Sequence, residues 1–214
     1  MVVESAVERR QFLQATAASS LLAASERSGA AEERRVPVVD AHLHCFAGQG
    51  DARFPYHPDG PYQPAEPATP EHLLKRMAEA GVDYAVVVHP EPYQDDHRYL
   101  EHCLEVGGGK FKGTCLFFAD RPGSLDKMTA LVKKHEGRIV SARIHAYAPD
   151  RLPPFGKPEL RAFWKHVGDL GLAVQLHFEP RYAPGFDPLI KEFPQTPVII
   201  DHLGRPFQGT PEEY

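Results

Sequence analysis

The stretch VPVVDAHLHCF, residues 36–46, joins an apolar, β-branched run to two histidines that are separated by one leucine. Successive side chains of a β-strand point to opposite faces, so Asp40, His42 and His44 share one face, while the residues between them form an apolar face. Cys45 has the opposite parity to His44, and we predict that it is a packing residue. A strand that turns polar on one face only, at its C-terminal end, predicts a functional site there.

Similar apolar runs recur along the chain and alternate with segments of helical periodicity. The predicted strands are residues 36–40, 83–89, 112–118, 138–145, 172–178 and 197–202. Repeated strand–helix units indicate a parallel α/β architecture. Strands that are apolar almost throughout are typical of sheets that are covered on both faces.

Two segments carry clear signals for the start and the end of a helix. In TPEHLLKRMAEAG, residues 69–81, Thr69 is a predicted N-cap, Pro70 suits the first helical position and Gly81 is a natural stop. The predicted apolar face of this helix consists of Leu73, Leu74, Met77 and Ala78. The segment KPELRAFWKHVGDLG, residues 157–171, repeats the plan and predicts a second amphipathic helix.

A long segment rich in proline, glycine and aromatic residues separates the first strand from the first helix, at residues 46–68. The run FPYHPDGPYQP within it is not expected to form regular structure, because proline has no backbone donor. Loops of this length in a compact domain are usually functional or disordered. The aromatic residues favour an ordered flap over the top of the sheet.

The last residues, GTPEEY, repeat the helix-start signal, with Thr210 as the N-cap and Pro211 after it. The earlier copy of this signal leads into a complete helix, but here the chain stops after one turn. We therefore expect a C-terminally truncated fragment that is catalytically silent and poorly behaved in solution.

Length and charge restrict the class of protein. A chain of 214 residues suffices for one sizeable domain. The net charge of -5 and the dispersed lysines and arginines argue against nucleic-acid binding. No uninterrupted apolar stretch approaches the roughly 20 residues that span a bilayer. The predicted partner is a small molecule, and these features leave the oligomeric state open.

The first 35 residues differ from the rest of the chain. Arg9 and Arg10 precede Phe12 and an Ala/Ser-rich, mildly apolar segment. This layout is typical of a twin-arginine export signal, which predicts a periplasmic protein. The alternative is a disordered N-terminus on a cytoplasmic protein. We therefore predict a signal and linker at 1–35 and one β/α domain at 36–214.

Polar residues gather at the C-terminal ends of five of the six predicted strands. They are His42 and His44, then His89 with Glu91, then Arg143, His145 and Tyr147, then Gln175 and His177, and finally Asp201, His202 and Arg205. Chemistry in parallel β/α folds takes place at this end of the strands. Any one of these histidines could be a buried core residue whose hydrogen bonds are all made within the protein. Their alignment at the same end of the strands nevertheless predicts a site.

Three motifs in this order, DAHLH, QLH and DHLGRP, resemble the amidohydrolase superfamily. The similarity is greatest to the amidohydrolase-related branch that includes 2-pyrone-4,6-dicarboxylate lactonase and the sugar lactonases. The resemblance implies a (β/α)8 TIM barrel of the metal-dependent-hydrolase type, with six of its eight units in residues 36–214. It also implies that the family's water-activating aspartate, on the eighth strand, is absent from this chain.

The resemblance implies catalytic roles for His42, His44, His177 and His202. In metal-dependent members of the superfamily, the positions of His42, His44 and His177 bind a divalent metal, here one zinc ion. Two-metal members need a lysine or glutamate on the fourth strand, and RIVSARIHAY offers neither. The lactonase that is most similar works without metal, so one zinc ion and no metal both remain open.

The expected substrate-binding residues are His89, Arg143, Tyr147 and Arg205. A guanidinium matches a carboxylate with two parallel hydrogen bonds, so two arginines predict an anionic group on the substrate. The resemblance implies that this substrate is a lactone or related cyclic ester. The lactonase that this chain resembles has a second arginine just after the one on its fourth strand. Here the nearest candidate is Arg151, which lies farther along the chain, and this difference disfavours a dicarboxylate substrate. A buried ion pair of Arg143 with Asp40 or Glu91 is the structural alternative. A carboxy-lyase of the same superfamily or an inactive fragment are the alternative functions.

Overall fold

The computed structural model describes residues 35–147 and 151–206. The predicted export signal and the helix start at Thr210 lie outside the described residues. The described residues from Pro37 onward form one compact unit. Among the described residues, no helix has the length and apolar character needed to cross a membrane.

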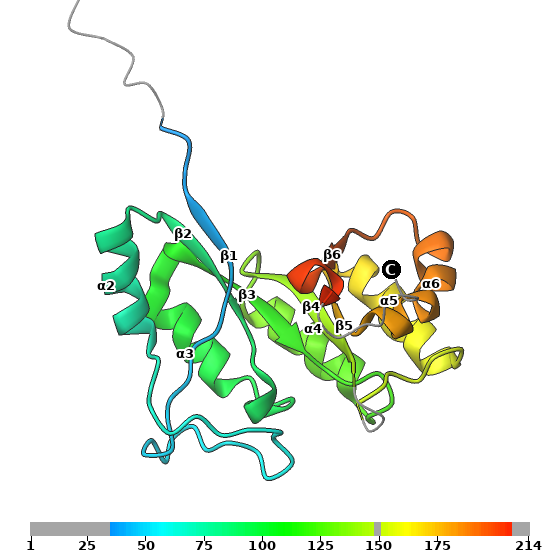
Figure 1. The fold of residues 1–214 in the computed structure, drawn as a ribbon, viewed down its shortest axis with the longest axis horizontal. Helices are drawn as coiled ribbons and strands as arrows, with labels where there is room; N and C mark the ends of the chain where they lie inside the picture. The colour runs from blue at the N-terminus through cyan, green and yellow to red at the C-terminus, as the bar shows by residue number, and fades with distance from the viewer. Residues whose placement is uncertain (1–34, 148–150, 207–214) are drawn as a thin grey trace, which may run out of the picture. The chain divides into compact units, whose positions relative to one another are not determined.

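Six parallel strands form one sheet in which neighbours in the chain are neighbours in space, and the sheet curls into a partial barrel (Figure 1). The strands are β1 (Val39–Leu43), β2 (Tyr84–Val88), β3 (Phe111–Leu116), β4 (Ile139–Ala146), β5 (Ala173–Phe178) and β6 (Val198–Ile200). All six predicted strands are confirmed. Most of their bounds agree with the prediction to within two residues.

Two strands differ from their predicted bounds, each for a local reason. β1 begins at Val39 rather than Val36, because the ladder to β2 starts where Val39 pairs with Tyr84. β1 also ends at Leu43 rather than at residue 40, so the first site histidine, His42, lies within the strand. β6 ends at Ile200 rather than His202, because the backbone then enters a left-handed turn.

Five helices are described: α2 (Pro70–Ala80), α3 (Arg98–Gly107), α4 (Ser124–Lys134), α5 (Pro158–Asp169) and α6 (Asp187–Glu192). The predicted caps of α2 are confirmed, because the Thr69 hydroxyl accepts a hydrogen bond from the His72 N–H and Gly81 has a φ of 69°. Ala78 is exposed, which corrects its predicted place on the buried face. α2 lies at the β1 end of the sheet (Figure 1), and its buried residues are Pro70 and Met77.

The hydrophobic core lies between the sheet and its helices. α5 buries Leu160, Phe163, Trp164 and Val167, and Cys45 packs in the same core, as its parity predicts. The other face of the sheet is the polar one. Register pairs Arg143 with Gln175 and His145 with His177 on β4 and β5, which places all four on that inner face.

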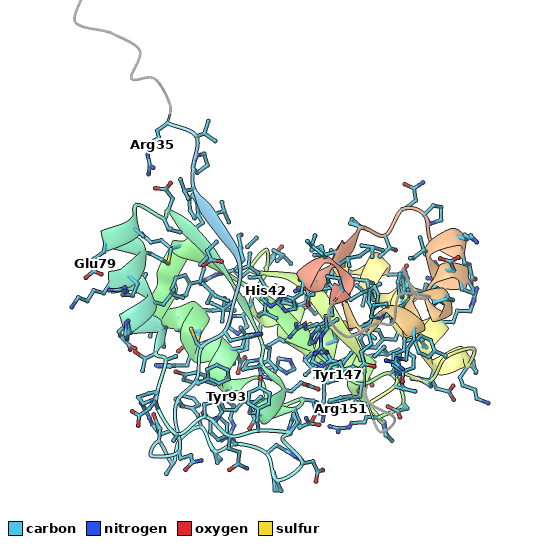
Figure 2. All side chains as sticks on the ribbon, viewed as in Figure 1. Arg35, His42, Glu79, Tyr93, Tyr147 and Arg151 are labelled. Atoms are coloured by element: carbon cyan, nitrogen blue, oxygen red, sulfur yellow. The ribbon has the colours of Figure 1, made fainter. Side chains whose placement is uncertain are left out.

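The segment between β1 and α2 is ordered against η2 (Glu91–Tyr93) and α3. An isolated bridge joins Phe46 to Ala68 at its base. The Tyr93 hydroxyl accepts a hydrogen bond from the Ala47 N–H at 2.8 Å, and the His57 N–H donates to the Pro92 carbonyl at 2.8 Å. Figure 2 shows Tyr93 among the side chains beside this segment. The structure thus has an ordered flap, and it lies beside the ends of β1 and β2.

Candidate active site

His44 is held in one tautomer by the backbone of the neighbouring strand. Its Nδ1 lies 2.7 Å from the carbonyl oxygen of Val88. A carbonyl only accepts, so Nδ1 carries the proton and Nε2 presents a lone pair. Burial lowers the pKa of His44 to about 4, so the ring is neutral at pH 7. Its ring meets that of His42 edge-on, with centroids 5.2 Å apart.

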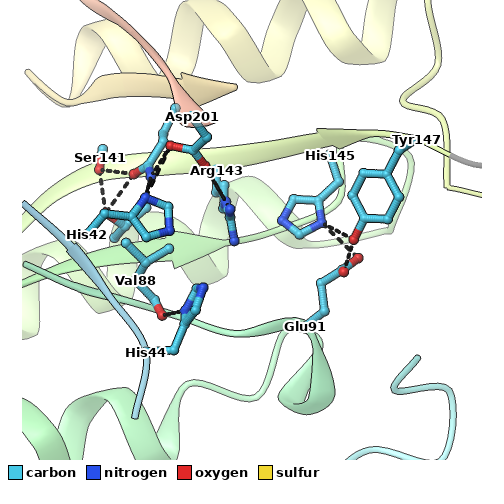
Figure 3. Close-up of polar contacts among 11 residues, drawn as sticks. His42, His44, Val88, Glu91, Ser141, Arg143, His145, Tyr147 and Asp201 are labelled. Carbon is cyan, nitrogen blue, oxygen red and sulfur yellow. Dashed lines mark hydrogen bonds and ion pairs between the residues drawn. The ribbon is translucent and has the colours of Figure 1, made fainter. Parts of the chain in front are cut away.

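Asp201 is the centre of the polar network behind His42 (Figure 3). It accepts from Nε of Arg143 at 2.8 Å and from Nε2 of Gln175 at 2.7 Å, and its Oδ1 lies 3.3 Å from Nδ1 of His42. Both Arg143 and Asp201 are buried. Burial raises the pKa of Asp201, but the bond from His42 and the charge of Arg143 outweigh it and hold the pKa well below its usual range. Asp201 therefore stays ionised and orients His42.

Gln175 connects this network to the middle of the sheet. Its Oε1 accepts hydrogen bonds from the hydroxyls of Thr114 at 2.9 Å and Ser141 at 3.2 Å. With both ends of the amide used, the Gln175 side chain is fixed, and it holds Asp201 in place in turn.

The turn after β6, η5 (Asp201–Gly204), brings His202 into the cluster. His202, Leu203 and Arg205 have φ values of 51°, 55° and 55°. The left-handed region disfavours residues other than glycine by roughly 1–2 kcal/mol each. This turn directs the His202 ring to 4.8 Å from the His42 centroid and 5.4 Å from that of His177, while Leu203 is 90% exposed. Such strain is typical of functional sites.

His177 connects the cluster to the end of β4. Its ring centroid lies 5.1 Å from that of His145 and 4.9 Å from that of Tyr147. Burial, followed by the charge of Arg143, lowers the pKa of His177 to about 2. The guanidinium of Arg205 lies over the Tyr147 ring, 5.1 Å from its centroid. His177 is therefore neutral in a pocket that arginines keep positive.

A second network lies at the end of β4 and centres on Glu91 (Figure 3). The Glu91 carboxylate lies 2.7 Å from Nδ1 of His145, accepts from the Tyr147 hydroxyl, and lies 3.3 Å from Nη1 of Arg151. Burial raises the pKa of Glu91, but the hydrogen bond from His145 and the nearby charges lower it overall. Glu91 is an ionised, buried carboxylate, and Tyr147 and Arg151 lie close together beside it (Figure 2).

The predicted substrate-binding residues have different surroundings. Arg143 is in a buried ion pair, but its partner is Asp201 and not Asp40 or Glu91. Tyr147 and Arg205 lie beside the histidine cluster. His89 is enclosed, only 1% exposed, and donates from Nε2 to the Gln94 carbonyl while its ring stacks on His97. Substrate contact by any of these residues stays a prediction.

Several donor atoms around His42 lie close enough together to hold a metal ion. Within the described residues, one group has its potential ligand atoms within 4.8 Å of one another: His42, Asp201 and His202. Asp201 is a poor ligand because its oxygens already bind Arg143 and Gln175. His44 fits better, since metal-binding histidines usually donate their second N–H to a carbonyl or carboxylate. The predicted set of His42, His44 and His177 stays a prediction.

A cavity of about 650 Å³, a suitable size for a small ligand, adjoins the second network, which centres on Glu91. It lies between the loops that follow β3 and β4. Glu91, His145 and Arg151 form the wall that it shares with the second network. Two flap residues, Asp59 and Pro61, line another side. The flap therefore forms part of the cavity wall.

A family model for amidohydrolases matches residues 39–214. The chain belongs to the amidohydrolase family. This confirms the resemblance predicted from DAHLH, QLH and DHLGRP, and the sheet is the six-stranded part of a TIM barrel of that family.

Two relatives of this amidohydrolase are named as enzymes that act on lactones. It is 29% identical over 170 residues to 4-sulfomuconolactone hydrolase of Rhizobium radiobacter, covering 78% of this chain and 52% of that protein. It is 28% identical over 182 residues to L-fucono-1,5-lactonase of Burkholderia ambifaria, covering 78% and 57%. The chain thus spans little more than half the length of these relatives.

Solved structures share the fold of this amidohydrolase. One is a probable 2-pyrone-4,6-dicarboxylic acid hydrolase from Acinetobacter baumannii with citric acid bound, with a TM-score of 0.67, 22% identity, and coverage of 79% of this chain and 60% of that one. Another is an amidohydrolase from Burkholderia multivorans with bound zinc, with a TM-score of 0.62, 13% identity, and coverage of 80% and 59%.

Sequence reasoning missed the partners that orient the histidines. The sequence places Asp201, Glu91 and Gln175 at strand ends and offers Glu91 as a partner of Arg143, but it does not predict that any of the three orients a histidine. Their signal was the shared parity of Gln175 with His177 and the position of Asp201 directly after a strand. The histidine that each of these residues orients depends on contacts between distant parts of the chain, such as Gln175 with Asp201, 26 residues apart, and Gln175 with His42, 133 residues apart.

Proposed function

We propose that this amidohydrolase hydrolyses a lactone or related cyclic ester that carries an anionic group. The observation that carries the proposal is the histidine cluster beside Arg205, in which His44 and His177 are neutral and His42 and His44 are oriented by Asp201 and Val88. The names of the two relatives support the reaction class. Fixed donors and acceptors around a reacting carbonyl act best in such a preorganised, partly buried site.

We further propose that one divalent metal ion, such as zinc, binds to His42, His44 and His177. The lone pair on Nε2 of His44 supports this, because that nitrogen cannot donate a hydrogen bond to a carbonyl oxygen. Zinc would polarise the lactone carbonyl and favour ionisation of a bound water. Asp201 would keep Nδ1 of His42 occupied, and Arg205 would hold the anionic group.

Zinc titration by calorimetry tests the metal. We expect one ion per chain, with affinity at least about tenfold weaker in His44→Asn. His72→Asn, an exposed histidine on α2, is the control and should leave affinity unchanged. Equal affinity in His44→Asn, or no binding by the parent, would exclude the metal and favour metal-free lactone chemistry.

Calorimetry with a γ-lactone carboxylate and with unsubstituted γ-butyrolactone tests the substrate class. We expect Arg205→Met to weaken binding of the carboxylate about tenfold or more and to spare the neutral lactone. In turnover by the full-length parent protein, the same change should raise KM more than it lowers kcat, because the charge is present in both ground and transition states. Arg98→Met, in an exposed pair with Asp96, is the control. If neither lactone binds, the proposed function is wrong.

We propose that residues 1–35 direct export through the twin-arginine route, on the strength of Arg9, Arg10 and the segment that follows them. A reporter fused to this segment should reach the periplasm, and changing both arginines to lysine should retain it in the cytoplasm. Export of the double variant would contradict the proposal.

A further inference from the structure

The second network leaves one histidine nitrogen without a partner. Nδ1 of His145 lies 2.7 Å from the ionised Glu91 carboxylate, so Nδ1 carries the proton and Nε2 presents a lone pair. Nε2 is buried and has no hydrogen-bond partner among the described residues. A buried acceptor without a partner destabilises a structure, so this nitrogen is suited to a donor that arrives from outside.

The groups around His145 do not supply that donor. The ring of His177 meets it edge-on at 5.1 Å, and the Tyr147 hydroxyl donates to Glu91. Arg143 uses Nε and Nη2 on Asp201. His145 also lines the adjoining cavity, so a ligand there would lie against this side chain.

The Glu91 end of the pair is fixed from three sides. Tyr147 donates to the carboxylate, and Arg151 lies 3.3 Å from it and 3.0 Å from the Tyr147 oxygen. Glu91 itself is only 6% exposed. The carboxylate therefore cannot turn away from His145, and the tautomer of His145 is built into the fold.

We propose that Nε2 of His145 accepts a hydrogen bond from a hydroxyl group of the bound lactone, and that Glu91 is the positioning residue that fixes the required tautomer. The inference rests on the proposed function, and it names a specificity residue that the family motifs do not include. A carboxylate or carbonyl oxygen of a ligand placed beside Nε2 would meet the nitrogen lone pair and be repelled. His145 therefore favours ligands that present a hydroxyl group at this position.

The test compares binding of galactono-γ-lactone, which carries hydroxyls, with γ-butyrolactone, which carries none. His145→Asn keeps an N–H near Glu91 and removes Nε2. We expect it to weaken binding of the hydroxylated lactone about tenfold and to leave γ-butyrolactone unchanged. His145→Gln returns an acceptor oxygen near the Nε2 position and should recover part of the preference.

A matched control is His135→Asn, which removes a different histidine–glutamate contact, to Glu101 between two helices. It should leave both affinities unchanged. The imidazole ¹⁵N spectrum gives a readout that is independent of affinity. It should show His145 protonated at Nδ1 in the parent protein and a mixture of the two imidazole tautomers in Glu91→Leu.

The outcomes separate the two proposals. If both lactones bind and His145→Asn leaves their affinity ratio unchanged, this inference is wrong and the proposed function stands. If neither these lactones nor the γ-lactone carboxylate binds the parent protein, the proposed function fails and this inference fails with it. If the carboxylate binds and galactono-γ-lactone does not, this inference alone is wrong. A protonated Nε2 on His145 in the parent protein would also overturn it.

Discussion

Asp201 is a single residue that connects the last strand of the sheet with the first. It follows β6, yet it binds Arg143 of β4 and Gln175 of β5 and approaches His42 of β1. The strand positions of His42, Arg143 and Gln175 were predictable from parity. The convergence on Asp201 was not, because it depends on sheet curvature and on the turn after β6. The sequence shows which side chains face inward, and only the tertiary structure shows which of them pair.

Removal of the Asp201 charge should destabilise the fold strongly. Asp201→Asn leaves the buried Arg143 guanidinium without a counter-charge, which typically lowers the free energy of unfolding by about 3–5 kcal/mol. Asp169→Asn breaks an exposed pair with Lys165 and should change it by less than about 1 kcal/mol. Urea denaturation at pH 7 measures both. A double change, Arg143→Met with Asp201→Asn, should recover part of the loss, and an Asp201→Asn protein as stable as its parent would refute the role of the pair.

His97 predicts how stability depends on pH. Burial lowers its pKa from 6.5 to about 3, with Nδ1 donating to the Asp95 carbonyl and Nε2 accepting from the Leu116 N–H. Between these two values the unfolded chain binds a proton that the folded chain does not. Stability should therefore fall as pH falls from about 6.5 to about 3, by about 1.4 kcal/mol per pH unit from this residue.

His97→Gln should reduce that slope by about the same amount. Urea denaturation at several pH values between 7 and 4 measures it, with His72→Asn, an exposed histidine, as the control. An unchanged slope in His97→Gln would show that His97 does not titrate as its burial implies.

At the scale of elements, predictions from local signals held best. α2 starts and ends where Thr69 and Gly81 predict, because caps act over a few residues. The bounds of β1 were less predictable, since pairing with β2 selects which part of the apolar run joins the sheet. The flap was predicted as ordered, but its attachment to η2 and α3 comes from contacts such as Tyr93 to Ala47, which local sequence does not encode.

The flap should loosen when Tyr93 loses its hydroxyl. Tyr93→Phe leaves the buried Ala47 N–H without its acceptor, which should lower the free energy of unfolding by about 1–3 kcal/mol and speed exchange of that amide. Tyr99→Phe is the matched control in the same aromatic cluster, because the Tyr99 hydroxyl is buried without a partner among the described residues. Tyr99→Phe should be neutral or stabilising. Equal loss in both variants would mean that the ring packing, and not the hydrogen bond, holds the flap.

At the scale of the molecule, the strand–helix rhythm predicted the parallel α/β class, and the family resemblance implied the barrel. Neighbouring strands pair in chain order because short β/α units leave few other parallel arrangements. Within the described residues β1 and β6 each pair on one side only, and Val39, Ile199 and Ile200 are exposed along them. Such edges favour self-association, and the poor behaviour expected in solution stays a prediction. The sheet's curl, which brings the ends of β1 and β6 together at His42 and Asp201, was implied only by the family resemblance.

The central claim is that the histidine cluster at the C-terminal ends of the strands binds a lactone, and imidazole ¹⁵N–¹H NMR tests it most directly. The chain, labelled at histidine, would be titrated with a γ-lactone carboxylate. We predict shifts in the resonances of His42, His44, His177 and His202. The resonances of His135 and His166, in the helical layer, should stay unchanged. Shifts confined to the helical layer, or none at saturating ligand, would contradict the account.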